Sequence, residues 1–191
     1  MAAIRELLIV GLGNLPYPAT RHSVGHLILD ALASSNGMSL RLDRVVGGFV
    51  ASKSDVPFGK ITVSLTLFKP NAFMNISGRS VANALRKTVV SPSNLIVIHD
   101  DLLRKPSTLS HKFGGSANGH NGVKSIIAGL GGETGFHRLR IGIGREGDAA
   151  EYVLDRLPLD ERLFWSKGGE GFELVCGEIA KIASRKGNGL R

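Results

Sequence analysis

One histidine and one carboxylate are spaced as a pair that can activate water. His22 follows a short apolar run at residues 7–10, and Asp100 comes at the end of a second apolar run at residues 95–98. Such runs predict buried strands, and an α/β sheet brings the carboxyl ends of its strands to one edge. A carboxylate there can orient an imidazole as a general base. We therefore expect His22 and Asp100 to act together on a water molecule.

Amide side chains accompany this pair. Neutral amides can hold a peptide backbone or a developing oxyanion without competing for the proton. Asparagine also favours turns, and that explanation suffices for Asn71 and Asn118. The other candidate amides near predicted strand ends or loops are Asn14, Asn75 and Asn121. No serine lies in a Gly-x-Ser-x-Gly elbow, so water is the simpler nucleophile.

The spacing of other reactive residues disfavours two further kinds of site. Gly11 and Gly13 suggest a dinucleotide fingerprint, but Pro16 stands where that motif requires a third glycine. No set of histidines, cysteines and acids shows metal-ligand spacing, and His120 stands alone in its loop. Cys176 lies in a helical apolar pattern, which indicates a buried thiol rather than a nucleophile. We therefore expect neither a nucleotide cofactor nor a metal.

The elements that must position these residues alternate along the chain. Apolar runs predict strands at residues 7–10, 45–52, 61–68, 95–98, 109–113 and 139–143. Helical spacing predicts helices at residues 23–34, 76–88, 123–130, 160–166 and 170–184. Gly11 and Gly13 are expected to allow a tight turn, and residues 55–59 to form a hairpin turn. The glycine-rich loop at residues 114–122 is expected to expose backbone amides at a helix start, where anions bind well. The pattern predicts an α/β sheet.

Charge and length narrow the class of partner. The chain has 191 residues, which fits one domain, and 24 Lys and Arg against 16 Asp and Glu give a net charge of +8. The stretch 102–145 contains a single acid, Glu133, and these seven basic residues: Arg104, Lys105, Lys112, Lys124, Arg138, Arg140 and Arg145. This suits a polyanion, although a solvated basic face explains charge alone equally well. The few aromatic residues disfavour a base-stacking surface, so phosphate contacts would carry the binding.

Hydropathy indicates a protein that is neither exported nor inserted in a membrane. No apolar run approaches the ~18 residues of a membrane span. Residues 1–6 are too short for a signal or transit peptide before the first predicted strand. We expect a soluble, intracellular protein without a membrane partner.

Taken in order, the motifs resemble those of the bacterial-type peptidyl-tRNA hydrolase family, which is also found in eukaryotes. The resemblance runs from residue 7 to about residue 145. It rests on the segments 9–14, 20–22, 73–78, 99–101, 119–122 and 138–144, and beyond Gly147 only the pattern matches. It implies a single α/β domain over residues 1–191, with a twisted mixed sheet flanked by helices. A flexible lid or connector at residues 145–158 and terminal helices at residues 159–186 complete that domain.

The resemblance also implies an activity and a set of site residues. The activity is hydrolysis of the ester between a peptide and the terminal ribose of tRNA, without a metal or an organic cofactor. His22 would be the base, Asp100 its partner and Asn14 the residue that orients the site. Those implied to touch the substrate are Asn75 and Asn121 on the peptide main chain, Tyr17 and Met74 lining the cleft, and Lys112 and Arg140 clamping tRNA phosphates.

The remaining expectations concern context. We expect a cytoplasmic monomer, with the mitochondrion as the alternative compartment. The alternative function is a non-catalytic RNA-binding protein of the same fold. Retention of His22, Asp100 and the three candidate amides argues against that alternative, and Pro16 argues against a nucleotide-dependent oxidoreductase.

Overall fold

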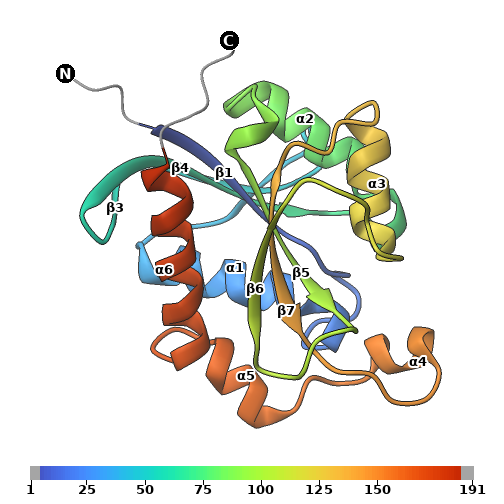
Figure 1. The fold of residues 1–191 in the computed structure, drawn as a ribbon. Coiled ribbons are helices and arrows are strands. Elements are labelled where there is room, and N and C mark those ends of the chain that lie inside the picture. Colours follow the sequence, from blue (N-terminus) through green and yellow to red (C-terminus); the bar gives the residue numbers. More distant parts are fainter. Residues whose placement is uncertain (1–4, 186–191) are drawn as a thin grey trace.

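A computed structural model describes residues 5–185, in which one seven-stranded sheet carries helices on both faces (Figure 1). The strand order is β2-β3-β4-β1-β5-β7-β6. The parallel strands are β1 (Arg5–Gly11), β4 (Ile61–Pro70), β5 (Leu95–Asp101) and β7 (His137–Gly142). The strands that pair antiparallel are β2 (Arg41–Asp43), β3 (Gly48–Phe58) and β6 (Leu109–Phe113). The predicted mixed α/β sheet is confirmed; residues 1–4 and 186–191 of the predicted domain lie outside the described residues.

Strand β1 divides the core into two layers. Leu7 and Ile9 point to one face and Leu8 and Val10 to the other, and all four side chains are fully buried. The first face packs against α1 (Val24–Ser35), α5 (Leu159–Trp165) and α6 (Glu170–Ser184). The second face packs against α2 (Gly78–Thr88) and α3 (Asn121–Gly129). Each such burial contributes about 1.5–3 kcal/mol, which explains why the strand is apolar on both faces.

The hairpin between β3 and β4 differs from the predicted one. Residues 55–59, expected to form the turn, belong almost entirely to β3, which ends at Phe58. A register shift lies between Lys53 and Val56, beyond which Val56 pairs with Val63. Val56 and Phe58 are buried in the core. Their burial outweighs the turn preference of the neighbouring Asp and Pro, so the strand continues past them.

The segment predicted as a flexible connector contains a helix, α4 (Ala149–Leu154). The side chain of Asp148 accepts hydrogen bonds from the backbone N–H groups of Ala150 and Glu151, which is a helix N-cap. The chain beyond α4 pairs with the loop before His22, since the Leu157 N–H donates to the Ala19 carbonyl. Flexibility of this segment stays a prediction.

Close backbone packing places the first loop on the sheet. Gly11 has no positive φ, so it does not serve the tight turn that the sequence suggested. A Cβ on Gly11 would lie 2.3 Å from the carbonyl oxygen of Gly25, and a Cβ on Gly25 would lie 2.4 Å from that of Ile98. The two glycines let the start of α1 approach β1 and β5. This approach sets the short 3₁₀ turn η1 (Arg21–Ser23) at the carboxyl end of β5.

The remaining short turns are η2 (Met74–Ile76) after β4 and η3 (Pro92–Asn94) before β5. Among residues 5–185 there is no helix long and apolar enough to cross a membrane.

Candidate active site

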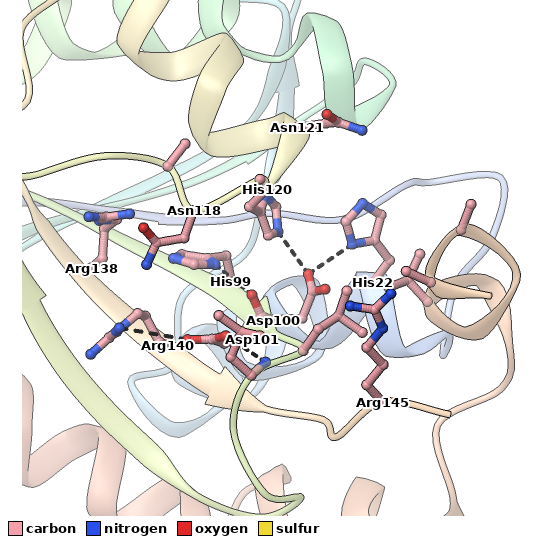
Figure 2. A pocket seen from close by; sticks show the side chains of 17 residues that line it. His22, His99, Asp100, Asp101, Asn118, His120, Asn121, Arg138, Arg140 and Arg145 are labelled. Carbon is pink, nitrogen blue, oxygen red and sulfur yellow. Dashed lines mark hydrogen bonds and ion pairs between the residues drawn. The ribbon is translucent and has the colours of Figure 1, made fainter. Parts of the chain in front are cut away.

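The structure brings His22 and Asp100 together at the carboxyl edge of the sheet. His22 Nδ1 donates a hydrogen bond to Asp100 Oδ1 at 2.9 Å, and Asp100 is 2% exposed. Burial opposes protonation of His22, but the charge of Asp100 and this hydrogen bond raise the pKa of His22 above its ordinary value. Figure 2 shows the other edge of the His22 ring directed away from Asp100, toward Asn121. That edge carries Nε2, which is free to accept a proton.

A second imidazole, which the sequence left alone in its loop, contacts the same carboxylate. His120 Nε2 lies 2.9 Å from Asp100 Oδ1 (Figure 2). His120 is also the N-cap of α3, because its Nδ1 accepts the N–H groups of Gly122 at 3.1 Å and Val123 at 3.3 Å. Burial alone would raise the pKa of Asp100, but His120 and His22 hold it well below its usual range. The site therefore has a permanently ionised acid between two imidazoles.

Two histidines and a carboxylate also resemble a metal-ligand set. The potential ligand atoms of His22, Asp100 and His120 lie within 4.8 Å of one another, a clustering that sequence spacing did not indicate. However, His120 Nδ1 already accepts two backbone N–H groups, so the imidazole proton resides on Nε2. A protonated nitrogen donates to Asp100 and cannot ligate a cation. The hydrogen bonding thus fits an acid–base site better than a metal centre.

The cap changes the expected role of the glycine-rich loop. The sequence predicted that this loop exposes free amides at the start of α3 to an anion. Instead His120 accepts the N–H groups of Gly122 and Val123, so these two amides are already satisfied. The start of α3 contributes Asn121, an exposed side chain, rather than an open anion site.

Asn14 is held in one orientation at the end of β1. The side-chain Oδ1 of Asn14 accepts a hydrogen bond from the Met74 N–H at 2.9 Å. The backbone N–H of Asn14 donates to Ser23 Oγ at 3.1 Å. Because Oδ1 is engaged, the NH₂ end of the amide is the one that remains for a substrate. The first loop, the turn after β4 and η1 are thereby locked together.

The residues expected to touch the peptide are distributed unevenly. Asn75 in η2 is exposed, and Tyr17 is 51% exposed on the loop after Asn14. Met74, predicted to line the cleft, is 4% exposed and packs against the start of α3, where a Cβ on Gly122 would lie 2.4 Å from its sulfur. In this structure Met74 therefore joins η2 to α3.

A cavity of about 380 Å³ connects the His22–Asp100 pair to basic side chains, a size typical of small-molecule sites. The polar and charged side chains that line it include His22, His99, Asp100, His120, Asn118, Asn121, Arg138, Arg140 and Arg145 (Figure 2). Residues of α4, Ala149, Ala150 and Val153, close one side. The helix that sequence analysis missed thus forms part of the cavity wall.

The basic wall comes from β6, an edge strand, and from its neighbour β7. Register pairs Ser110 with Arg140 and Lys112 with Arg138, so all four side chains lie on one face of β6 and β7. Arg138 is 1% exposed and donates to the carbonyl groups of the glycine-rich loop, so it is a structural residue rather than part of a solvated basic face. Arg140 Nη2 donates to Ser110 Oγ at 2.7 Å and lines the cavity, while Lys112 lies farther along the same face.

Comparisons with known proteins agree on one family. A family model described as peptidyl-tRNA hydrolase matches residues 8–183. The chain is 44% identical over 148 residues to the peptidyl-tRNA hydrolase of Symbiobacterium thermophilum, which covers 76% of each protein. It is 41% identical over 167 residues to that of Pseudomonas putida, covering 85% of this chain and 82% of the relative. The crystal structure of peptidyl-tRNA hydrolase from Acinetobacter baumannii matches with a TM-score of 0.75 and 29% identity, over 96% of this chain and 95% of that chain. This chain therefore belongs to the peptidyl-tRNA hydrolase family.

Proposed function

We propose that the protein hydrolyses the ester between a peptide, or an N-blocked amino acid, and the terminal ribose of tRNA. The relatives that bear the name of this activity are 41–44% identical over most of the chain. The observation that carries the proposal is the His22–Asp100 hydrogen bond at 2.9 Å, in a cavity whose opposite wall is basic. The His22–Asp100 pair suits ester hydrolysis, and the basic wall suits a polyanionic substrate.

The geometry supports the role of general base that we propose for His22. Its Nδ1–H donates to Asp100, so Nε2 accepts a proton from water as the water oxygen attacks the ester carbonyl carbon. The tetrahedral oxyanion then expels the ribose oxygen, which takes the proton from the imidazolium. Asp100 stabilises that imidazolium and fixes the tautomer. Protonation of Nε2 at low pH removes the base, so activity falls. Because ionised Asp100 raises the pKa of His22, this fall sets in at a higher pH than for a free imidazole.

The amides supply substrate selection in this proposal. Asn14 orients the site, and Asn75 and Asn121 hold the N–H and C=O groups of the peptide main chain. Tyr17 and Met74 complete the peptide cleft, Met74 through its packing on α3. A free aminoacyl ester would place a charged ammonium where these amides match a neutral peptide group, so blocked substrates are favoured.

Phosphate contacts place the tRNA. Lys112 and Arg140 lie on the same face of β6 and β7, with Arg140 at the cavity wall and Lys112 beyond it. We assign both to tRNA phosphates. Such contacts release counterions, so affinity decreases as salt rises. The proposal also includes a protein that works as a monomer, without a cofactor. The bacterial origin of the relatives bears only on the compartment, which we propose to be the cytoplasm.

Release of peptide from N-blocked aminoacyl-tRNA tests the reaction. The wild-type protein is expected to release peptide, and His22→Ala to lose about 10²- to 10⁴-fold in kcat/KM, since it lacks the general base. Binding of tRNA by His22→Ala should remain, which controls for folding. A wild-type protein that binds tRNA without releasing peptide would instead support the non-catalytic RNA-binding alternative.

Separate variants test the phosphate contacts. Lys112→Ala and Arg140→Ala should weaken hydrolysis of the tRNA substrate, and each should reduce its salt dependence. An N-blocked amino acid ester of a simple alcohol lacks the tRNA body, so its hydrolysis should change little. Equal losses on both substrates would show that these residues support the site structurally.

A further inference from the structure

We propose that His120 is a positioning residue, which ties the catalytic carboxylate of Asp100 to the first turn of α3 and shares that carboxylate with His22. The inference goes beyond the roles assigned above, and its kinetic readout rests on the proposed function. It is carried by the hydrogen bonds of both nitrogens of the His120 ring.

The first step is the tautomer of His120. Its Nδ1 accepts the N–H groups of Gly122 and Val123, at 3.1 and 3.3 Å. A nitrogen that accepts hydrogen bonds carries no proton, so the ring is neutral and its single N–H is on Nε2. That N–H points to Asp100 Oδ1 at 2.9 Å. Folding of α3 therefore fixes His120 as a donor to the acid.

The second step is competition for a single oxygen. His22 Nδ1 also lies 2.9 Å from Asp100 Oδ1, and the two imidazole rings are 5.1 Å apart. Each donor partly neutralises the carboxylate, which reduces the attraction left for a proton on His22. His120 thus limits how strongly Asp100 favours the imidazolium. His22 therefore stays unprotonated, and able to act as a base, down to a lower pH than it would without His120.

Other charged and titratable groups surround the cluster. His99 meets the His120 ring edge-on at 4.6 Å and donates from Nδ1 to the Asp100 carbonyl at 2.7 Å. Burial holds the pKa of His99 well below its ordinary value, so it stays neutral. The charged groups facing the same cavity are Asp101 from β5, Arg138 and Arg140 from β7, and Arg145 beyond β7. Arginines keep their charge across the working range.

The third step concerns the substrate. Residue Asn121 opens α3, directly after the cap, and faces the same cavity. A carboxylate bound to the cap and an amide carried by the first turn must move together. The tether therefore sets the distance between the general base and a group that holds the peptide, which is the purpose of a positioning residue.

Two substitutions separate the tether from the cap. His120→Asn keeps a favoured N-cap but is too short to reach Asp100, while His120→Phe removes both interactions. In both variants the acid-side midpoint of kcat/KM should rise by about 0.5–1 pH, and kcat/KM below that midpoint should fall about three- to tenfold. The melting temperature should fall clearly only in His120→Phe. The rate at high pH should stay within about tenfold of wild type.

Other outcomes overturn the proposal. An unchanged midpoint in a folded His120→Asn variant would show that His120 is only a cap. A shift confined to His120→Phe would assign the effect to the placement of α3. A loss at all pH values as large as that of His22→Ala would make His120 a catalytic group.

A readout without turnover separates this proposal from the function itself. Long-range ¹H–¹⁵N spectra of the histidines should show His120 protonated on Nε2, and the NMR midpoint of His22 should rise in His120→Asn. If the wild type releases no peptide while these signals appear, the proposed function fails and the tether stands. A proton on His120 Nδ1 overturns the tether whatever the activity.

Discussion

Two clusters in this molecule contain the same residue types, two histidines and one carboxylate, in different arrangements. In the site cluster, His22 and His120 both contact one oxygen of the buried Asp100 at 2.9 Å. In the second cluster, on the face of β6 and β7 opposite to Arg138 and Arg140, His111 Nε2 is hydrogen-bonded to His137 Nδ1 at 2.8 Å. The carboxylate of that cluster, Glu178 of α6, is 3.5 Å from His111 Nδ1.

The different arrangements give opposite proton affinities. Burial opposes protonation everywhere, but direct contact with Asp100 raises the pKa of His22. In the second cluster burial prevails: the pKa of His111 is lowered despite Glu178, and burial with the charge of His111 lowers that of His137 to about 4. Direct contact with the buried Asp100 offsets the effect of burial on His22, whereas Glu178 at 3.5 Å does not offset it at His111. Composition therefore does not distinguish the two clusters, whereas contact geometry does.

The strongest test of this comparison removes the charge of each carboxylate. Asp100→Asn should reduce kcat/KM for peptide release by about 10²- to 10⁴-fold, because the imidazolium loses its partner. The acid-side midpoint of the remaining activity should move to lower pH, since Asp100 is what raises the pKa of His22. Initial rates across a pH series measure both effects.

The matched change in the second cluster is Glu178→Gln, for which peptide release should equal that of wild type. Comparable losses in the two variants would show that the two clusters do not differ in function. An Asp100→Asn variant with full activity would show that the contact to His22 is dispensable.

A second test measures how protein stability changes in acid, where His137 and His22 are expected to contribute with opposite signs. The pKa of His137 is about 4 in the folded protein against 6.5 for the free side chain, so the unfolded chain binds more protons between these values. Stability from this group is present above pH 6.5 and is lost as pH falls toward 4. His137→Gln keeps a hydrogen-bonding side chain and removes the titration. Between pH 7 and 4.5 the wild type should lose about 1–3 kcal/mol more unfolding free energy than the variant, measured by urea unfolding.

His26 provides the background for that measurement. Burial lowers its pKa to about 3, and it titrates equally in wild type and variant, so both lose some stability in acid. Identical pH slopes for the two proteins would mean that His137 is not held neutral by the fold. His22 contributes in the other direction, because its raised pKa favours the folded state below about pH 6.5.

Sequence reasoning succeeded where local pattern determines position. The apolar runs before His22 and Asp100 predicted two central strands, and parallel neighbours place their ends at one edge of the sheet. Apolar spacing predicted an α/β sheet and most of its helices, whereas the mixed strand directions were implied by the family resemblance. Positions that depend on contacts between distant segments were harder to predict from the sequence. For example, most of the turn predicted at residues 55–59 is strand, because Val56 is buried in the core.

The site shows the same division. His120 was left alone because its contact to Asp100 depends on where the glycine-rich loop lies, 20 residues away in sequence. Arg138 was counted with the surface charges, yet its guanidinium is buried under loop carbonyls. The one missed signal was local, since Asp148 before residues 149–154 is a favoured N-cap and could have predicted α4.

The smallest expected effect sharpens the comparison within the second cluster. Glu178 also pairs with Lys181 at 3.1 Å and is near solvent, so Glu178→Gln should change the unfolding free energy by less than about 0.5 kcal/mol at pH 7. Its attraction raises the pKa of His111 against burial, so the NMR midpoint of His111 should fall further in the variant. A midpoint that rises would mean that Glu178 does not act on His111 through its charge. A fall without any change in peptide release would confirm that proton affinity in this cluster is uncoupled from the reaction, because its rings face away from the cavity that holds His22.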